Sequence, residues 1–404
     1  MNLISKLSTY KQEQLLRFEN ELTEQEKQNL HKQILDLDFS YLDELNKTTT
    51  KKEDIITPIK AKTLLEIKAN QLKYEKIGIE ALKNNQVGAL LLAGGMGTRL
   101  GSDKPKGMFN IGKTKDVFIF QRLFENLLEV VNKTGKMVPF FIMTSEKNND
   151  DTINFLEENN YFGYDKNYVR FFVQEMAPCV DFNGKILLEE KSRVATSPNG
   201  NGGWFNSLLN NKQAKQMLED FDIKWLNVFA VDNVLQKIAD PIFIGATIDG
   251  KYQIGSKVIR KVDPREKVGV MCNKNGKPSI VEYIDLTEEM AYETDTNGER
   301  VYNFGVILNY LFNVDLLYKI KDEKLPIHVV TKKVPYINEN GTLISPSEPN
   351  AHKFEMLCVD MIEYADCLPF EVPREDEFAP IKNKTGVDSV ESAQELLEKN
   401  GYTL

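Results

Sequence analysis

The chain has 404 residues, of which 41% are hydrophobic and 27% charged, and its formal net charge is −9. These values are typical of a globular protein of about two or three domains, and the negative charge argues against a surface that neutralises the phosphates of a nucleic acid. The sequence has no apolar run of about 18 residues that would predict a membrane span, and its charged N-terminus lacks the apolar stretch of a secretory signal.

The cysteine pattern bears on location. The four cysteines form no CxxC pair and have no His-rich sequence beside them, so neither a zinc site nor a disulfide framework is predicted. We therefore expect a cytoplasmic protein that binds neither nucleic acid nor a membrane. The sequence leaves its oligomeric state open.

Residues 1–84 have a helical pattern. Thr23 and Glu26 have the spacing of a capping box at a helix start. The apolar residues that suit one face of the following helix are Leu22, Leu30, Ile34 and Leu35. No residue of this region suggests chemistry, so we expect a helical N-terminal region of unassigned role.

Residues 85–320 are predicted to form one α/β domain. Short apolar runs at 87–93, 138–143, 169–174 and 225–233 each end in a polar loop, and helical patterns separate them. Continuous apolar strands alternating with helices predict a parallel sheet covered on both faces, with ligands at the carboxyl ends of its strands. Proline breaks and a capped helix near 388–401 then predict a small C-terminal domain over 321–404.

The loop after the first strand is the strongest signal of a ligand. Gly94, Gly95 and Gly97 allow a tight turn whose N–H groups can approach a phosphate chain closely. Arg99 offers a planar fork for phosphate oxygens, and Lys106 offers a point charge. An ordinary strand-to-helix turn with surface charges is the alternative. The combination of glycines and cations after a buried strand favours the phosphate site.

Two familiar nucleotide motifs resemble this region. The dinucleotide pattern GxGxxG fails, because Leu100 occupies its last glycine position. The pattern GxxxxGK[ST] matches from Gly107 to Thr114 and would indicate an NTPase. Such a loop should leave a buried strand directly, whereas SDKPK precedes Gly107. A helix starting near Asp116 keeps this alternative open.

A second glycine-rich stretch spans Thr196–Phe205, TSPNGNGGWF. Gly200, Gly202 and Gly203, beside Asn199 and Asn201, permit close approach of the backbone to a ligand. Asn-Gly is also a common hairpin turn, but so many turn residues before a tryptophan-led helix favour a functional loop.

Three charged residues complete the set of candidates. Asp232 follows a buried strand, where a carboxylate can hold Mg²⁺ against a triphosphate or can cap a helix. Glu282 could accept hydrogen bonds from sugar hydroxyls or could face water. Lys382 follows a proline bend that suits reaching into a neighbouring site. The three histidines, none of which lies near a serine or cysteine in a suggestive pattern, predict no hydrolytic triad.

Taken together, these residues resemble the eukaryotic-type UDP-N-acetylglucosamine pyrophosphorylases, within the wider UDP-sugar pyrophosphorylase family. The matching segments are LLLAGGMGTRLG with PKGM, FFVQEMAPCV, PNGNGGWF, VDNVLQKIADP, the stretch from VGV to VEY, and VPREDEFAPIKN. They cover roughly residues 87–400 in the order that the family has. The Gly107–Thr114 match is then a coincidence, because Gly107 belongs to the family's PKGM segment.

The resemblance implies a fold, a reaction and roles for residues. It implies a Rossmann-like nucleotidyltransferase sheet domain between the helical region and the small C-terminal domain. It implies transfer of uridylyl from UTP to N-acetylglucosamine 1-phosphate, with Mg²⁺ or Mn²⁺ as cofactor. Arg99, Lys106 and Lys382 would hold phosphates, and Asp232 the metal. The residues that would contact the uridine or the sugar are Gly94, Gly95, Gln174, Gly200, Asn201, Gly269 and Glu282.

Departures from the family pattern lie on the sugar side. Val306 stands where members of N-acetyl specificity tend to have the asparagine of an AGN turn, and Leu357 and Val359 replace two phenylalanines of a KFVFD-like strand. A UDP-glucose or broad-specificity UDP-sugar pyrophosphorylase is therefore the alternative. A sensor that binds UDP-sugar without releasing pyrophosphate is a further one.

Overall fold

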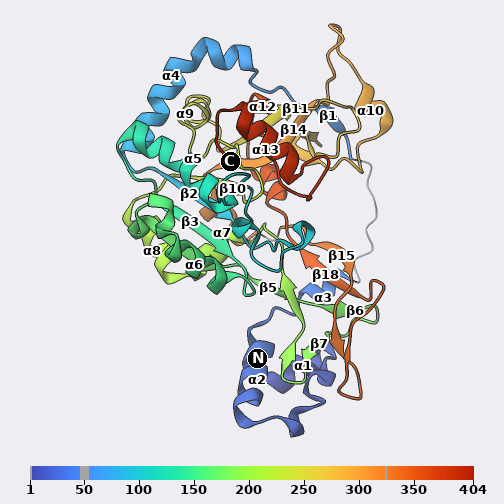
Figure 1. Ribbon diagram of the computed structural model, residues 1–404. Coiled ribbons are helices and arrows are strands. Elements are labelled where there is room, and N and C mark those ends of the chain that lie inside the picture. Colours follow the sequence, from blue (N-terminus) through green and yellow to red (C-terminus); the bar gives the residue numbers. More distant parts are fainter. Residues whose placement is uncertain (1, 46–53, 324) are drawn as a thin grey trace. The chain divides into compact units, whose positions relative to one another are not determined.

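The structure, a computed structural model, describes residues 2–45, 54–323 and 325–404 (Figure 1). It divides into two compact units, each built from three stretches of chain. Unit 1 comprises Met1–Lys52, Gln174–Gly203 and Lys324–Cys358, and unit 2 comprises Glu53–Val173, Trp204–Glu323 and Val359–Leu404. In the described residues, no helix combines the length and the apolar character that crossing a membrane requires.

Unit 1 combines short helices with small sheets. Its helices are α1 (Leu3–Tyr10), α2 (Glu24–Asp36) and α3 (Tyr41–Glu44). The strands β15 (His328–Lys332), β18 (Ala351–Glu355) and β6 (Val180–Asp181) form one sheet, and β5 (Met176–Pro178) pairs with β9 (Thr196–Pro198).

The predicted capping box of α2 is confirmed. Glu26 accepts from the Thr23 N–H, and its own N–H donates to the Thr23 hydroxyl. Leu30 and Ile34 are fully buried, as the apolar face predicts, but Leu35 is 42% exposed. A helix turns about 100° per residue, so Leu35 points away from the stripe that Leu30 and Ile34 share.

A ten-stranded sheet forms the centre of unit 2. The four strands that the sequence predicts are neighbours in the order β10-β2-β3-β4, and all three pairings are parallel. Every residue of β2 is buried, which explains its continuous apolar run. The bounds of these strands are β10 (Trp225–Ala230), β2 (Val87–Leu92), β3 (Phe140–Thr144) and β4 (Val169–Val173). Their carboxyl ends therefore lie at one edge of the sheet.

The sheet is mixed rather than wholly parallel, which corrects the prediction. Beyond β10 it continues through antiparallel pairings of β14 (Phe304–Asn313), β12 (Val270–Lys274) and β1 (Ile56–Pro58). The hairpin from β12 to β13 (Lys277–Val281) turns at Asn275 and Gly276, whose φ values are 53° and 80°. Two left-handed residues form the tight turn that joins antiparallel strands.

Helix α4 (Leu64–Lys83) belongs to unit 2 and packs closely on α9 (Pro241–Asp249) (Figure 1). A Cβ on Gly78 would lie 1.9 Å from the Pro241 carbonyl oxygen, and one on Gly245 would lie 1.8 Å from that of Tyr74. Only glycine at each position lets the two helix backbones approach so closely.

The two units differ from the three consecutive segments expected from the sequence. Residues 64–83 join the sheet unit through α4, and residues 325–358 belong to unit 1. The rest of the C-terminal segment belongs to unit 2, where β19 (Cys367–Glu371) pairs in parallel with β11 (Ile254–Arg260). Strand pairing between distant segments, which local patterns do not reveal, produces this division.

Candidate active site

The glycine loop after β2 folds back on itself. The Gly97 N–H donates to the Lys104 carbonyl at 2.8 Å, and the Lys106 N–H donates to the Gly95 carbonyl at 3.1 Å. Asn148, fully buried, donates from Nδ2 to the Ala93 carbonyl at 2.9 Å. These bonds hold the loop at the carboxyl end of β2. Sequence reasoning missed Asn148, whose signal was its position shortly after β3.

Nothing in the described part of the chain requires glycine at position 95. A Cβ there would meet no atom of the described residues within 4 Å, and its φ is not in the left-handed region. The residue is exposed and its neighbour Gly94 is half-buried. Gly97, by contrast, is buried, and its Cβ would lie 3.1 Å from the Ser102 Cβ. The open space above Gly95 is where a ligand could approach the backbone.

Charged residues gather beside this loop. The Lys106 ammonium lies 3.9 Å from the Asp232 carboxylate, with side-chain exposures of 16% and 23%. Burial is the main cause that lowers the pKa of Lys106, Asp232 opposes it, and the positive charges of Arg99 and Lys382 lower it further. Lys106, Arg99 and Lys382 thus share one neighbourhood with the carboxylates of Asp232 and Asp388, and the three cations outnumber these two anions. Such a site is suited to a polyanion.

Hydrogen bonds hold part of the C-terminal segment next to Asp232 and Asn233. The Ile381 N–H donates to the Asp232 carbonyl at 2.9 Å. The Ala379 N–H donates to Oδ1 of Asn233 at 2.9 Å, and Nδ2 of Asn233 donates to the Glu377 carbonyl at 2.8 Å. Segment 377–381 is therefore fixed to the residues that follow β10.

Lys382 comes directly after that fixed segment. Its ammonium lies 2.9 Å from a carboxylate oxygen of Asp388, and its side chain is 38% exposed. An ammonium has three donors, so the bond to Asp388 leaves capacity for a phosphate oxygen. The charge of Lys382 also acts on Lys106, which places both lysines in the neighbourhood of Arg99 and Asp232.

A second cluster in unit 2 contains the predicted sugar residues. A Cβ on Gly269 would lie 2.9 Å from Ile280 Cγ2 and 3.5 Å from both Glu282 Oε1 and Val306 Cγ2. The Val306 N–H also donates to the Gly269 carbonyl at 2.9 Å. The structure therefore places Val306, a position where the sequence departs from the family pattern, beside Gly269 and Glu282.

In unit 1, the glycines of PNGNGG pack against the protein's own backbone. Gly200 has a φ of 87°, and a Cβ there would lie 2.2 Å from the Met356 carbonyl oxygen. The Gly202 N–H donates to that oxygen at 2.8 Å. Asn201 accepts the Cys358 N–H through Oδ1 at 2.9 Å. Gly200 and Asn201 therefore have a structural role, whatever they also bind.

The remaining predicted residues are Gln174, Leu357 and Val359. Gln174, at the start of the second stretch of unit 1, is only 7% exposed. Leu357 is half-buried, and its backbone nitrogen lies 2.8 Å from where a Gly202 Cβ would be. Val359 is half-buried and belongs to unit 2.

The GxxxxGK[ST] match does not have the structure of a phosphate loop. It begins in a short 3₁₀ turn, Lys106–Met108, rather than at the end of a strand. The Lys113 ammonium lies 2.8 Å from Glu398, and the Thr114 hydroxyl donates to the Leu404 carbonyl at 2.5 Å. A strand before the loop and a free lysine would be required, so the NTPase alternative is contradicted.

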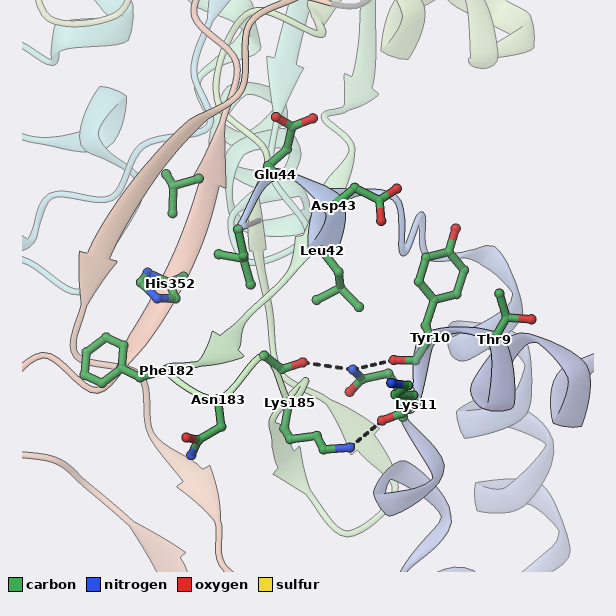
Figure 2. Close-up of a pocket in the computed structure, with 14 residues that line it drawn as sticks. Thr9, Tyr10, Lys11, Leu42, Asp43, Glu44, Phe182, Asn183, Lys185 and His352 are labelled. Carbon is green, nitrogen blue, oxygen red and sulfur yellow. Dashed lines mark hydrogen bonds between the residues drawn. The ribbon is translucent and has the colours of Figure 1, made fainter. Parts of the chain in front are cut away.

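Unit 1 contains a cavity of about 670 Å³ whose lining residues are drawn in Figure 2. It is lined by residues that include Tyr10, Asp43, Phe182 and His352, and none of the predicted site residues lines it. The Lys185 ammonium donates to the Lys11 carbonyl across one side of it. Its mixed charges do not resemble a phosphate site.

The donor set for a metal is small. In the parts of the chain that the structure describes, no three His, Cys, Asp or Glu side chains group to hold a metal ion. Asp232 offers one carboxylate. Mg²⁺ is commonly held by one or two carboxylates together with substrate phosphates and water, so Asp232 fits an ion that arrives with a nucleotide.

Comparisons with known proteins give the family. The family model described as UTP–glucose-1-phosphate uridylyltransferase matches residues 32–400. The UDP-N-acetylhexosamine pyrophosphorylase-like protein 1 of Mus musculus is 38% identical over 331 residues, which are 79% of this chain and 64% of that protein. The UDP-N-acetylglucosamine pyrophosphorylase of Saccharomyces cerevisiae is 36% identical over 345 residues, which are 82% of this chain and 72% of that protein.

A solved structure agrees with these relatives. The uridine diphosphate N-acetylglucosamine pyrophosphorylase of Trypanosoma brucei matches with a TM-score of 0.83 at 28% identity, over 98% of this chain and 83% of that chain. The match to the mouse protein spans less than two thirds of its length. The predicted α/β nucleotidyltransferase fold is confirmed. The chain belongs to the UTP–glucose-1-phosphate uridylyltransferase family, as its resemblance to the UDP-sugar pyrophosphorylases predicted.

Proposed function

We propose that the chain is a uridylyltransferase that makes UDP-N-acetylglucosamine and pyrophosphate from UTP and N-acetylglucosamine 1-phosphate. The observation that carries the proposal is that Lys106 lies 3.9 Å from Asp232 and is close enough to Arg99 and Lys382 for their charges to act on it, in a site beside the loop that follows β2. The names of the yeast and trypanosome relatives support the choice of substrates.

The proposed step is an in-line displacement at the α-phosphorus of UTP. A phosphate oxygen of the sugar 1-phosphate forms a bond to this phosphorus, the bond from it to the β-bridging oxygen breaks, and pyrophosphate leaves with that electron pair. The attacking oxygen is already anionic at neutral pH, so no general base is needed. Catalysis then consists of positioning the two phosphates and stabilising charge.

Each cation has a proposed task in that step. Arg99, exposed on the loop, binds the β- and γ-phosphates with its planar fork and stabilises the leaving pyrophosphate. Lys106, largely buried, offsets charge at the α-phosphoryl group. Lys382 binds the incoming phosphate. Gly94 and Gly95 allow the nucleotide close to the backbone.

Asp232 would hold Mg²⁺ or Mn²⁺ together with oxygens of the nucleotide. When bound, the ion supplies charge neutralisation on the triphosphate. The 3.9 Å between the Lys106 ammonium and the Asp232 carboxylate exceeds hydrogen-bond distance. The carboxylate oxygens are therefore not committed to Lys106.

The sugar assignment rests on Gly269 and Glu282, whose carboxylate could accept hydroxyl hydrogen bonds. Val306 beside them supports the alternative of a UDP-glucose or broad-specificity enzyme. A valine side chain offers no hydrogen bond to an acetamido group, whereas asparagine offers both a donor and an acceptor.

Gln174, Gly200 and Asn201 are proposed to contact uridine on the resemblance alone. A cytoplasmic location is proposed because the cysteine pattern of the sequence predicts no disulfide framework.

The test is release of pyrophosphate with UTP, Mg²⁺ and a panel of sugar 1-phosphates. We expect the largest kcat/KM with N-acetylglucosamine 1-phosphate. A preference for glucose 1-phosphate would favour the alternative. Binding of UDP-sugar with no pyrophosphate released from any substrate would contradict the proposal and indicate a sensor. Lys113→Ala is the matched control, because its loss would stop an NTPase and spare a pyrophosphorylase.

A further inference from the structure

Lys257 is a buried lysine that is not proposed to contact substrate. It binds two segments of the chain that also carry residues proposed to contact substrate. Lys257, on β11, is fully buried, and its ammonium lies 3.1 Å from Asp240 and 2.6 Å from Glu377. It also donates to the Lys237 carbonyl at 3.1 Å. All three ammonium protons are thus used. Burial opposes the charged form, but the two carboxylates outweigh it and raise the pKa of Lys257.

Packing alone does not explain this residue. Removing an ammonium and two carboxylates from water costs several kcal/mol per ion, and apolar side chains of similar volume often serve stability as well or better. The register of β11 against β14 also shifts between Ser256 and Val258, where residues 307–309 of β14 lie opposite Lys257 alone. Such irregularities are common next to functional sites.

The contacts of Lys257 lead directly to the proposed site. Glu377 ends α12 (Arg374–Glu377), and its carbonyl accepts from Asn233 at 2.8 Å. Asn233 follows Asp232, whose carbonyl accepts the Ile381 N–H at 2.9 Å. The Lys257 ammonium therefore anchors one end of segment 377–381, and the other end leads into Lys382.

We infer that Lys257 is a positioning residue that fixes segment 377–382 through Glu377, so that Lys382 and Asp232 keep the spacing that one pair of phosphates requires. This inference rests on the proposed function. Lys257 contacts neither substrate in this scheme and acts only through Glu377.

Lys237 provides a matched control. Its ammonium lies 3.6 Å from the other carboxylate oxygen of Glu377, but its side chain is 56% exposed, whereas that of Lys257 is fully buried. An exposed ion pair contributes little. Lys237→Met removes a cation from the same carboxylate while leaving the buried anchor in place.

The first measurement is steady-state pyrophosphate release by Lys257→Met. We expect kcat to fall roughly 10- to 100-fold, by analogy with loss of a preorganised contact, and Lys237→Met to stay within about twofold of the wild type. If Lys257 acts through Lys382, the kcat of the double variant Lys257→Met/Lys382→Met should lie no more than about twofold below that of Lys382→Met alone. Losses that multiply in the double variant would overturn the inference.

A second variant guards against misfolding, because Lys257→Met leaves two buried carboxylates without their cation. Glu377→Gln keeps the volume and an accepting oxygen, so it should fold while weakening the anchor. Amide hydrogen exchange at Ala379 and Ile381 should become at least about tenfold faster in Glu377→Gln. This factor corresponds to a free energy of local opening that is lower by about 1.4 kcal/mol. The exchange rates should stay unchanged in Lys237→Met. Unchanged exchange in Glu377→Gln would contradict the inference.

These readouts separate the two proposals. A wild-type chain that releases no pyrophosphate contradicts the proposed function, while the exchange measurement still tests the anchoring. An active wild type with full kcat in folded Lys257→Met and Glu377→Gln contradicts only the positioning role.

Discussion

The two glycine-rich loops look alike in sequence and differ in structure. In unit 2, a Cβ on Gly95 would meet open space, and cations lie beside the loop. In unit 1, a Cβ on Gly200 would lie 2.2 Å from a backbone oxygen, and Asn201 is bonded to Cys358. Glycine in the first loop leaves room for a ligand, whereas glycine in the second lets the chain pack on itself.

The role of a glycine cluster therefore depends on the atoms that surround it in the fold. Where the protein itself occupies the space beside a glycine, substitution should cost stability first. Where the space is empty and charged side chains face it, substitution should cost binding and leave stability unchanged. Substitutions in and around the two loops separate these two outcomes.

Arg99→Ala should cause the largest loss. Arg99 is exposed on the first loop and is proposed to stabilise the leaving pyrophosphate. Losing one preorganised charge typically costs roughly 10²-fold or more in rate, so kcat/KM should fall by that factor while Tm stays unchanged. Pyrophosphate release is the measurement. A change of less than about threefold would remove Arg99 from the proposed mechanism.

Asp232→Ala should weaken the dependence on metal. The carboxylate is the one proposed protein ligand of Mg²⁺, so the concentration of Mg²⁺ that gives half-maximal rate should rise by roughly tenfold, or about 1.4 kcal/mol. Asp388→Ala, which removes a nearby carboxylate bonded to Lys382, is the control for general loss of negative charge. Activity at an unchanged metal optimum in Asp232→Ala would show that the metal is held elsewhere.

The glycine pair tests the contrast itself. Gly200→Ala places a side chain at a φ of 87°, which costs about 1–2 kcal/mol before the clash with Met356 is counted, so its Tm should fall. Gly95→Ala should keep the wild-type Tm and raise the KM for UTP by roughly tenfold, or about 1.4 kcal/mol. Thermal unfolding and UTP kinetics on both variants decide the matter. The contrast fails if Gly95→Ala loses stability and Gly200→Ala does not.

Gln174→Ala should have the smallest effect. A glutamine that hydrogen-bonds the uracil would contribute about 1 kcal/mol of discrimination, so preference for UTP over other nucleoside triphosphates should drop by roughly fivefold. Relative kcat/KM for UTP, CTP and ATP measures this preference. The same preference in the variant as in the wild type would place recognition of the base at other residues.

Local patterns predicted the parallel half of the sheet well. Strands β2, β3 and β10 are buried throughout or nearly so, so continuous apolar runs identify them. The antiparallel half was missed, because β14 alternates between buried and half-buried positions along its first residues. Its neighbour β11 lies far from it along the chain, and so does β19, which pairs in parallel with β11.

The candidate site was predictable only where chemistry lies in one local stretch. Gly95, Arg99 and Lys106 are close in sequence and their loop follows a buried strand. The approach of Lys382 depends on backbone bonds to residues after β10, and the sequence alone offered only a proline bend. Lys257 could not be found, because nothing in its own strand reveals carboxylates that lie far along the chain.

The proposed phosphate site is best tested by a structure of the chain bound to UTP. We expect the phosphates to lie within hydrogen-bond distance of amides of the loop from Ala93 to Lys106 and of the Arg99 guanidinium, with Asp232 facing the same triphosphate. Bound nucleotide whose phosphates lie away from this loop and contact none of these groups would contradict the proposal.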